Sequence, residues 1–176
     1  MAKTALIVYF TMTGETGLLA RRLGVALDAA VERIEPRGPA PDQPGLGLAT
    51  RLRTRAEAIV GLRQPIRPVR LSPADYGLVL IGCPAVLGRV PSPVRQWLSD
   101  HGEDLPPAVG FFASTGGPRP EAMFADLARH ANRPPLATLA VPRACQGSER
   151  EDALMIGFVK ELLPALPLLR QQRVMV

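Results

Sequence analysis

The sequence is poor in the residues that define several common protein classes. It contains two cysteines among 176 residues, too few for a disulfide framework, and no Cys/His spacing typical of a zinc module. No segment approaches the ~18 consecutive apolar residues of a membrane span. The amino-terminal Met-Ala-Lys-Thr leads directly into an apolar run without a signal-peptide layout. We therefore expect a cytoplasmic globular protein, in line with its 47% hydrophobic and 21% charged residues.

Lysine is almost absent, because Lys3 and Lys160 are the only two, so arginine supplies nearly all of the net charge of +5. Arginine favours planar contacts with phosphate and carboxylate groups, which indicates an anionic partner. The alternative is GC-rich coding, which enriches Arg, Ala, Gly and Pro together. Aromatic residues make up 5% and do not interleave with the dispersed arginines, a pattern that argues against nucleic-acid binding.

What the chain does have is an alternation of short apolar runs and helical patterns. The runs predict buried strands at residues 4–10, 78–82, 109–113 and 136–141, with a weaker fifth at 30–35. Apolar stripes at helical spacing follow the first run and occupy 92–99, 121–131 and 148–163, the last behind a Ser148 cap. The last stripe includes Met155, Ile156, Val159, Leu162 and Leu163. Alternation of this kind predicts a parallel α/β sheet with right-handed crossovers.

The middle and the end of the chain are less regular. Residues 36–47 are rich in Pro and Gly and predict a loop, 49–62 look helical, and 64–72 are again irregular. Residues 164–176 contain two prolines and predict an extended tail that packs on the domain or contacts a partner. We found no internal repeat, so residues 1–176 are expected to form one domain.

A hydroxyl-rich loop lies between the first predicted strand and the first helix. It comprises Thr11, Met12, Thr13, Gly14, Glu15 and Thr16. In an open α/β sheet, ligands bind outside the carboxyl ends of the strands, where a helix N-terminus offers N–H groups to a phosphate. The loop lacks the lysine of a nucleotide P-loop and the spacing of GxGxxG, so it suits a terminal phosphate monoester, or it is simply a capped helix.

Three segments, in order, resemble the flavodoxin-like family: LIVYFTMTGET, DYGLVLIGCPAVLGRVPSPVRQWL and VGFFASTGG. The resemblance implies one doubly wound α/β domain, a five-stranded parallel sheet of order 2-1-3-4-5 with helices on both faces, and FMN as cofactor. The first segment would hold the FMN phosphate through residues 11–16. The other two would contact the flavin ring through Pro84, Ala85, Val86, Leu87 and Gly88 and through Ser114, Thr115, Gly116 and Gly117.

Three features depart from the family pattern. The loop at 84–88 has no Trp or Tyr to stack on the ring, a contact worth roughly 0.5–1.5 kcal/mol. Glu15 places a carboxylate where a phosphate would bind. A sequence pI near 10 differs from the acidic charge of electron-carrier flavodoxins. The last point favours a flavin or quinone reductase acting on small or anionic substrates.

Several isolated residues allow both a functional and a structural interpretation. Cys83 ends the third predicted strand and is expected to be a buried thiol, and Cys145 lies near the same edge. His101 and His130 lie near predicted helix C-termini, where a cation is favourable. The loop arginines Arg89 and Arg119 either face solvent or offset charge on a reduced flavin or a substrate anion, and Trp97 belongs to a helix core stripe.

These features lead to two main hypotheses. The first is an FMN-binding, flavodoxin-like protein in electron transfer, a small oxidoreductase that uses NAD(P)H or a redox partner as donor and an acceptor such as a quinone. The second is a flavodoxin-fold interaction module with weak or lost flavin binding. A third, a flavoprotein docked on an acidic membrane surface through its arginines, has only the net charge behind it. No side-chain triad is visible, so no catalytic residue and no metal ligand is assigned.

Overall fold

The fold is a single parallel sheet covered on both faces by helices. The computed structural model describes residues 4–37, 64–85, 88–117 and 120–165. The strands are β1 (Ala5–Tyr9), β2 (Ala30–Arg33), β3 (Leu78–Gly82), β4 (Ala108–Thr115) and β5 (Thr138–Pro142). The helices are α1 (Glu15–Ala26), α3 (Ser92–His101), α4 (Pro120–Ala131) and α5 (Glu149–Leu162), with short 3₁₀ turns η1 (Pro73–Asp75) and η2 (Arg143–Cys145).

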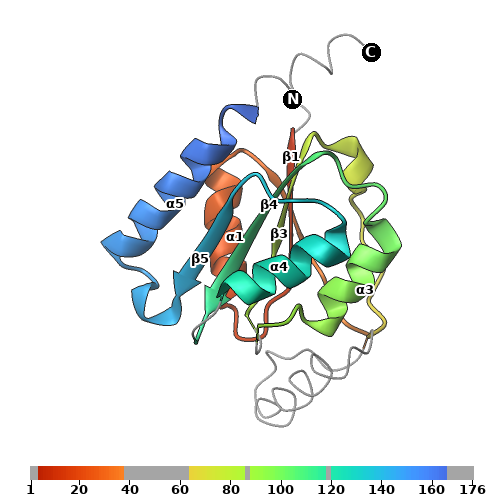
Figure 1. The fold of residues 1–176 in the computed structure, drawn as a ribbon, viewed down its shortest axis with the longest axis horizontal. Coiled ribbons are helices and arrows are strands. Elements are labelled where there is room, and N and C mark those ends of the chain that lie inside the picture. The colour runs from red at the N-terminus through yellow and green to blue at the C-terminus, as the bar shows by residue number, and fades with distance from the viewer. Residues whose placement is uncertain (1–3, 38–63, 86–87, 118–119, 166–176) are drawn as a thin grey trace.

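The strand order is β2-β1-β3-β4-β5, and all four neighbouring pairs are parallel. In register, Ile7 of β1 lies between Val31 of β2 and Leu80 of β3. The predicted α/β class and the order 2-1-3-4-5 are therefore confirmed. In Figure 1 the strands run downward, so their carboxyl ends lie together at the bottom of the view.

Each face of the sheet has its own apolar core. Alternate residues of the strands pack with Leu19 and Leu23 of α1 and with Phe158 of α5 on one face. The other face packs against α3 and α4, which lie in front of the sheet in Figure 1, and includes the fully buried Trp97. The central strands β1, β3 and β4 are buried along their whole length, as expected for strands covered on both sides.

The structure shifts some predicted boundaries. β4 extends to Thr115, two residues past the predicted end, because Ser114 and Thr115 still pair with Val141 and Pro142 of β5. β5 begins at residue 138, and Leu136, predicted in the strand, is 49% exposed.

The apolar stripe of α5 was also predicted incompletely. Its buried apolar residues are Met155, Phe158 and Leu162, whereas Ile156 and Leu163 of the predicted stripe are 56% and 48% exposed. Phe158 follows Met155 by three residues and precedes Leu162 by four, so these three form the stripe that faces the sheet.

The crossover from β2 to β3 is described at both of its ends. Pro36 and Ile66 form an antiparallel bridge, Arg37 N–H donates to the Pro65 carbonyl, and Arg67 N–H donates to the Glu35 carbonyl. Residues 64–72 form no helix or strand, as predicted. The helix predicted at 49–62 and most of the tail predicted at 164–176 lie outside the described residues.

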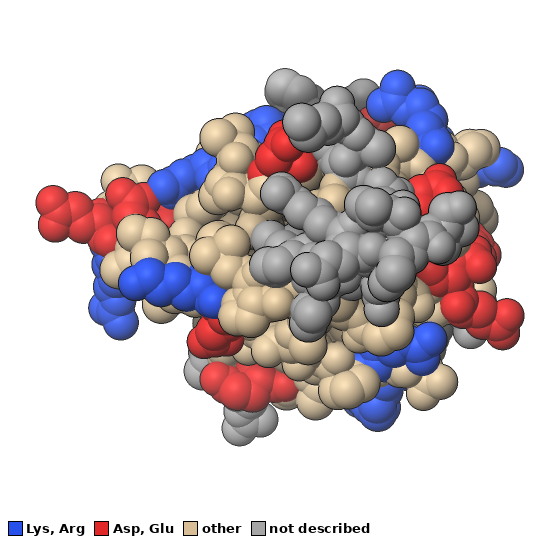
Figure 2. Space-filling model, turned by 90° about the horizontal axis from the view of Figure 1, so that it is seen from above, with Lys and Arg blue, Asp and Glu red and all other residues tan. Residues whose placement is uncertain are grey.

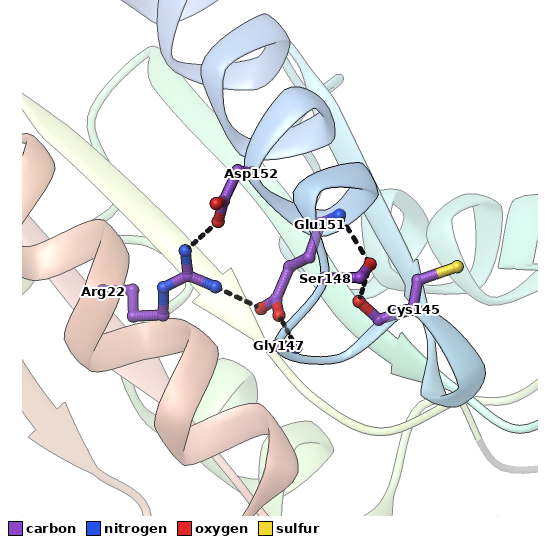
Figure 3. A network of polar contacts seen from close by, with 6 residues as sticks. All are labelled: Arg22, Cys145, Gly147, Ser148, Glu151 and Asp152. Atoms are coloured by element: carbon purple, nitrogen blue, oxygen red, sulfur yellow. Dashed lines mark hydrogen bonds and ion pairs between the residues drawn. The ribbon is translucent and has the colours of Figure 1, made fainter.

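A polar network joins α1 to the start of α5 (Figure 3). Arg22 forms ion pairs with Asp152 and, at 2.9 Å, with Glu151, whose carboxylate also accepts the Gly147 N–H at 2.6 Å. Ser148 caps α5 by accepting the Glu151 N–H at 3.4 Å, so the predicted cap is confirmed. The acceptor Asp152, helped by Glu151, raises the pKa of Arg22, so the guanidinium group stays charged.

The end of the molecule shown in Figure 2 carries charged side chains of both signs. On the end of the molecule shown in Figure 2, Lys and Arg groups alternate with Asp and Glu groups around the periphery. Mixed signs of this kind do not produce the continuous basic stripe typical of nucleic-acid interfaces.

Candidate functional site

Three strand ends meet at the carboxyl edge of the sheet. Phe10 N–H, just after β1, donates to the Gly82 carbonyl at 2.9 Å. Past β3, the backbone N–H groups of Cys83 and Ala85 donate to Phe112 and Ser114 of β4, each at 3.2 Å. The three segments that resemble flavin-contacting loops are therefore adjacent, which sequence order alone could not establish.

The first loop turns sharply at Gly14, which has a left-handed φ of +89°. Gly14 N–H donates to Thr11 Oγ1 at 3.0 Å, and the Gly14 carbonyl accepts from Leu18 to begin α1. No side chain caps this helix, so the N–H groups of its first turn point to the carboxyl edge without intrahelical acceptors. A Cβ at Gly14 would meet nothing within 4 Å, so the space beside the turn is open.

The three threonines of this loop have different environments. Thr13 is exposed, whereas Thr11 and Thr16 are buried. Thr16 and Ser114 share a buried hydrogen bond of 2.7 Å between their hydroxyl oxygens, which links α1 to the end of β4. Thr13 is therefore the solvent-exposed threonine of this loop, and Thr16 links the first loop to the end of β4.

Glu15 is paired with an arginine that sequence reasoning did not find. Arg143 lies in the turn η2 after β5. Its Nε is 2.7 Å from Glu15 Oε1, and a terminal guanidinium nitrogen donates to Glu15 Oε2 at 3.0 Å. Two contacts of this kind form a bidentate pair. The pair compensates the negative charge that opposed phosphate binding in the sequence interpretation.

The second loop is held down by a buried carboxylate. Gly88 has a left-handed φ of +69°, and a Cβ there would lie 3.3 Å from that of Ala122. Two residues later, Val90 N–H donates to Asp126 Oδ2 at 2.9 Å. Pro84 and Ala85 are half-buried, while Val86 and Leu87 lie outside the described residues.

Asp126 itself is 2% exposed and has two arginines and a histidine close to its carboxylate. Arg129 donates to its Oδ1 at 2.6 Å, and the nearest nitrogens of Arg89 and His130 lie at 3.8 and 3.9 Å. Arg89 therefore contacts a carboxylate rather than facing solvent alone. Sequence reasoning missed Asp126, although an acidic residue within the apolar stripe of α4, between Met123 and Leu127, is a visible signal.

Cys83 lies between the loop and the core and is fully buried. Its Sγ contacts Met123 Sδ at 3.7 Å. Burial, with a smaller contribution from Asp126, raises the pKa of this thiol to about 12. The predicted buried position of this thiol is confirmed.

The third segment was predicted as a loop from Ser114 to Gly117, and this is partly wrong. Ser114 and Thr115 are buried strand residues, and only Gly116 and Gly117 extend past the sheet. Both glycines are exposed, and a Cβ at either would meet nothing within 4 Å. Their backbone is therefore accessible to a ligand.

Two further searches covered the described ranges. Among residues 4–37, 64–85, 88–117 and 120–165, no group of three or more His, Cys, Asp and Glu could hold a metal ion. No helix in those ranges is long and apolar enough to span a membrane. His101 stacks near Trp97, with ring centroids 5.4 Å apart, at the end of α3.

Comparisons with known proteins place this architecture among flavodoxin-like folds. A flavoprotein from Lactobacillus acidophilus NCFM, solved in complex with FMN, is 20% identical with a TM-score of 0.64, covering 79% of this chain and 93% of that one. A protein from Bacteroides eggerthii DSM 20697 described as a flavoprotein is 21% identical with a TM-score of 0.69, covering 88% and 97%.

A third neighbour is Megasphaera elsdenii flavodoxin in its two-electron reduced form, 18% identical with a TM-score of 0.53, covering 86% of this chain and 94% of that one. No protein-family model matches the chain, and no curated protein matches it in sequence. The chain therefore has the flavodoxin-like fold, as the sequence resemblance implied.

Proposed function

We propose that this protein binds FMN and transfers electrons as a small flavin-dependent oxidoreductase. The observation that carries the proposal is the adjacency of the three strand-end segments at the carboxyl edge of the sheet. The FMN complex of the structurally similar Lactobacillus flavoprotein supports it. In open α/β sheets this edge is where ligands bind.

The residues after β1 fit a phosphate monoester. The uncapped N-terminus of α1 supplies backbone N–H donors and a positive dipole end, and Thr13 supplies an exposed hydroxyl. Gly14 leaves the turn free of side-chain atoms. The pair between Glu15 and Arg143 removes most of the repulsion that an isolated carboxylate would exert.

The residues after β3 and β4 fit a flat apolar ring with a polar edge. Pro84 and Ala85 present small apolar surface, and Gly116 and Gly117 let the backbone approach closely. FMN, when bound, supplies the redox chemistry, accepting and donating electrons. The chain's own residues hold and orient it, which agrees with the absence of a nucleophilic triad from the sequence.

The electron donor and acceptor in this proposal are small molecules or a redox partner. The sequence pI of about 10 favours anionic reactants, such as NAD(P)H as donor, over the basic partners of acidic carriers. A quinone is the acceptor class that we propose. Steady-state oxidation of NADPH with a soluble quinone, with and without FMN, measures this activity.

The proposal is tested by titrating the purified protein with FMN and following flavin fluorescence. Thr13→Ala should weaken FMN binding about tenfold, the effect of losing one hydrogen bond to a charged group. Riboflavin, which lacks the phosphate, should bind both proteins equally. Thr138→Ala, an exposed threonine of β5, is the matched control. No quenching at high micromolar FMN would refute the proposal.

A second function is favoured by the small side chains beside the predicted ring. Pro84 and Ala85 provide no aromatic surface, and the neighbouring Val86 and Leu87 add none. A module that uses the fold for protein interaction would show no saturable FMN or riboflavin binding. The same titration therefore separates the two functions.

A further inference from the structure

A polar groove lies beside the edge strand β2, apart from the three loops described above. It has a volume of about 490 Å³, within the ~300–1,000 Å³ range of small-molecule sites. Four arginines line it: Arg21 of α1, Arg33 at the end of β2, and Arg67 and Arg70 of the segment that leads to β3. No part of the candidate FMN site requires them.

The groove has an excess of positive charge. Among the described residues that line the groove, the acidic ones are Glu32 and Glu35, so four arginines minus two glutamates give these residues a formal charge of +2. Arg67 lies 3.6 Å from Glu35, and Arg70 lies 3.9 Å from Glu32, distances longer than those of strong ion pairs. Arg21 has no carboxylate partner within the described ranges. A bound dianion would balance this charge.

The backbone that carries two of these arginines is fixed in place. Both carboxylate oxygens of the buried Glu32 accept backbone N–H groups, from Arg70 at 2.6 Å and from Leu71 at 2.7 Å. Arg67 N–H donates to the Glu35 carbonyl at 2.7 Å. Because the Glu32 carboxylate accepts these backbone N–H groups, it fixes the position of the segment, while the Arg67 and Arg70 side chains are 64% and 93% exposed. A preorganised site of this kind loses less entropy on binding.

The uncharged residues that line the groove could contact the apolar part of a ligand whose anionic group binds the arginines. Tyr9, Val31 and Pro68 line it together with the arginines. Val31 is 37% exposed although it lies in a strand, so the edge of the sheet presents apolar surface next to the cations. Arginine forks match the geometry of phosphate oxygens, and the volume admits a group of mononucleotide size.

We propose that this groove binds a small phosphorylated molecule carrying at least two negative charges. The site does not depend on flavin, so it can be present whether or not the chain binds FMN. Carboxylates share part of this chemistry, and the experiment below distinguishes them.

The test is isothermal titration of the FMN-saturated protein with inorganic pyrophosphate, with citrate as the carboxylate probe. The variant R67Q/R70Q removes two exposed charges and their long ion pairs with Glu35 and Glu32, and it keeps the two backbone N–H groups that donate to the Glu32 carboxylate. The matched control is R150Q/K160Q, which removes two exposed charges from α5. This helix packs on β5, at the end of the sheet opposite β2. Thermal unfolding checks that both variants fold.

We expect pyrophosphate to bind R67Q/R70Q about tenfold more weakly than the unchanged protein, and R150Q/K160Q to bind it normally. Citrate should bind more weakly than pyrophosphate. Equal loss in both double variants would show a net-charge effect, and citrate binding as tight as pyrophosphate would refute the phosphate class. FMN titration of R67Q/R70Q should be unchanged, so failure here is distinguishable from failure of the proposed function.

Discussion

The ion pair between Glu15 and Arg143 controls the charge at the proposed phosphate site, so its two partners should have opposite effects when neutralised. Glu15→Gln removes a negative charge from the first turn of α1 and frees Arg143 for the phosphate. Arg143→Gln leaves Glu15 without its partner. We expect the first variant to bind FMN more tightly and the second to bind it more weakly.

The magnitude follows from Coulomb's law. Glu15 is the first residue of α1, so an anion on the N–H groups of that turn would lie roughly 7 Å from its carboxylate. With an effective dielectric constant between about 40 and 80, a dianion at that distance interacts with one charge by about 1–2 kcal/mol. This corresponds to roughly a five- to thirtyfold change in the dissociation constant.

The assay is fluorescence titration with FMN and riboflavin at low salt and again near 1 M salt. Both effects should disappear with riboflavin and shrink at high salt, where the Debye length is about 3 Å. Loss of the exposed pair itself should alter unfolding free energy by less than about 1 kcal/mol. Equal effects on FMN and riboflavin, or weaker FMN binding by Glu15→Gln, would refute the reasoning.

Three further predictions concern the site and its supports. Burial raises the pKa of Cys83 from 9.0 to about 12, so the contribution of the protonated thiol to the free energy of unfolding is complete below pH 9 and is lost as the pH rises toward 12. At pH 10 the loss should be about 1.4 kcal/mol. Urea unfolding measures it as the difference between the pH dependence of the unchanged protein and that of Cys83→Ala. Asp126→Asn should lower the free energy of unfolding by about 1–3 kcal/mol, since the buried carboxylate serves both Val90 N–H and Arg129, whereas Asp100→Asn on the exposed face of α3 should have little effect in the same urea titration. Gly116→Ala should change the free energy of unfolding by less than about 0.5 kcal/mol, because the added methyl meets no protein atom within 4 Å. The same methyl would occupy space proposed for the flavin ring, so the variant should bind FMN less tightly. Unchanged FMN affinity would place the ring elsewhere.

The strands were predictable because the apolar runs are short, continuous and separated by helical stripes, and the order 2-1-3-4-5 followed from the resemblance to the flavodoxin-like family. The weak run at 30–35 was also found, although only Glu32 of β2 is buried. Boundaries were less predictable. Ser114 and Thr115 have loop-like composition, and only pairing with β5 keeps them in β4.

The site was predictable in its segments but not in its electrostatics. The loops around Gly14, Pro84 and Gly116 follow strands and are visible in the sequence. Arg143 and Asp126 act from distant segments, on Glu15 and on Val90. Pairs separated by 128 and 36 positions have no local pattern, so their roles depend on tertiary contacts.

The bridge between Pro36 and Ile66 holds the start and the end of the crossover from β2 to β3 next to each other. Residues on both sides of positions 38–63 are already joined by backbone hydrogen bonds, so the two ends of this stretch start and finish beside each other. Chain length between two fixed neighbours affects loop entropy only logarithmically. We therefore expect a change of chain length between residues 37 and 64 to alter the entropy of loop closure only slightly.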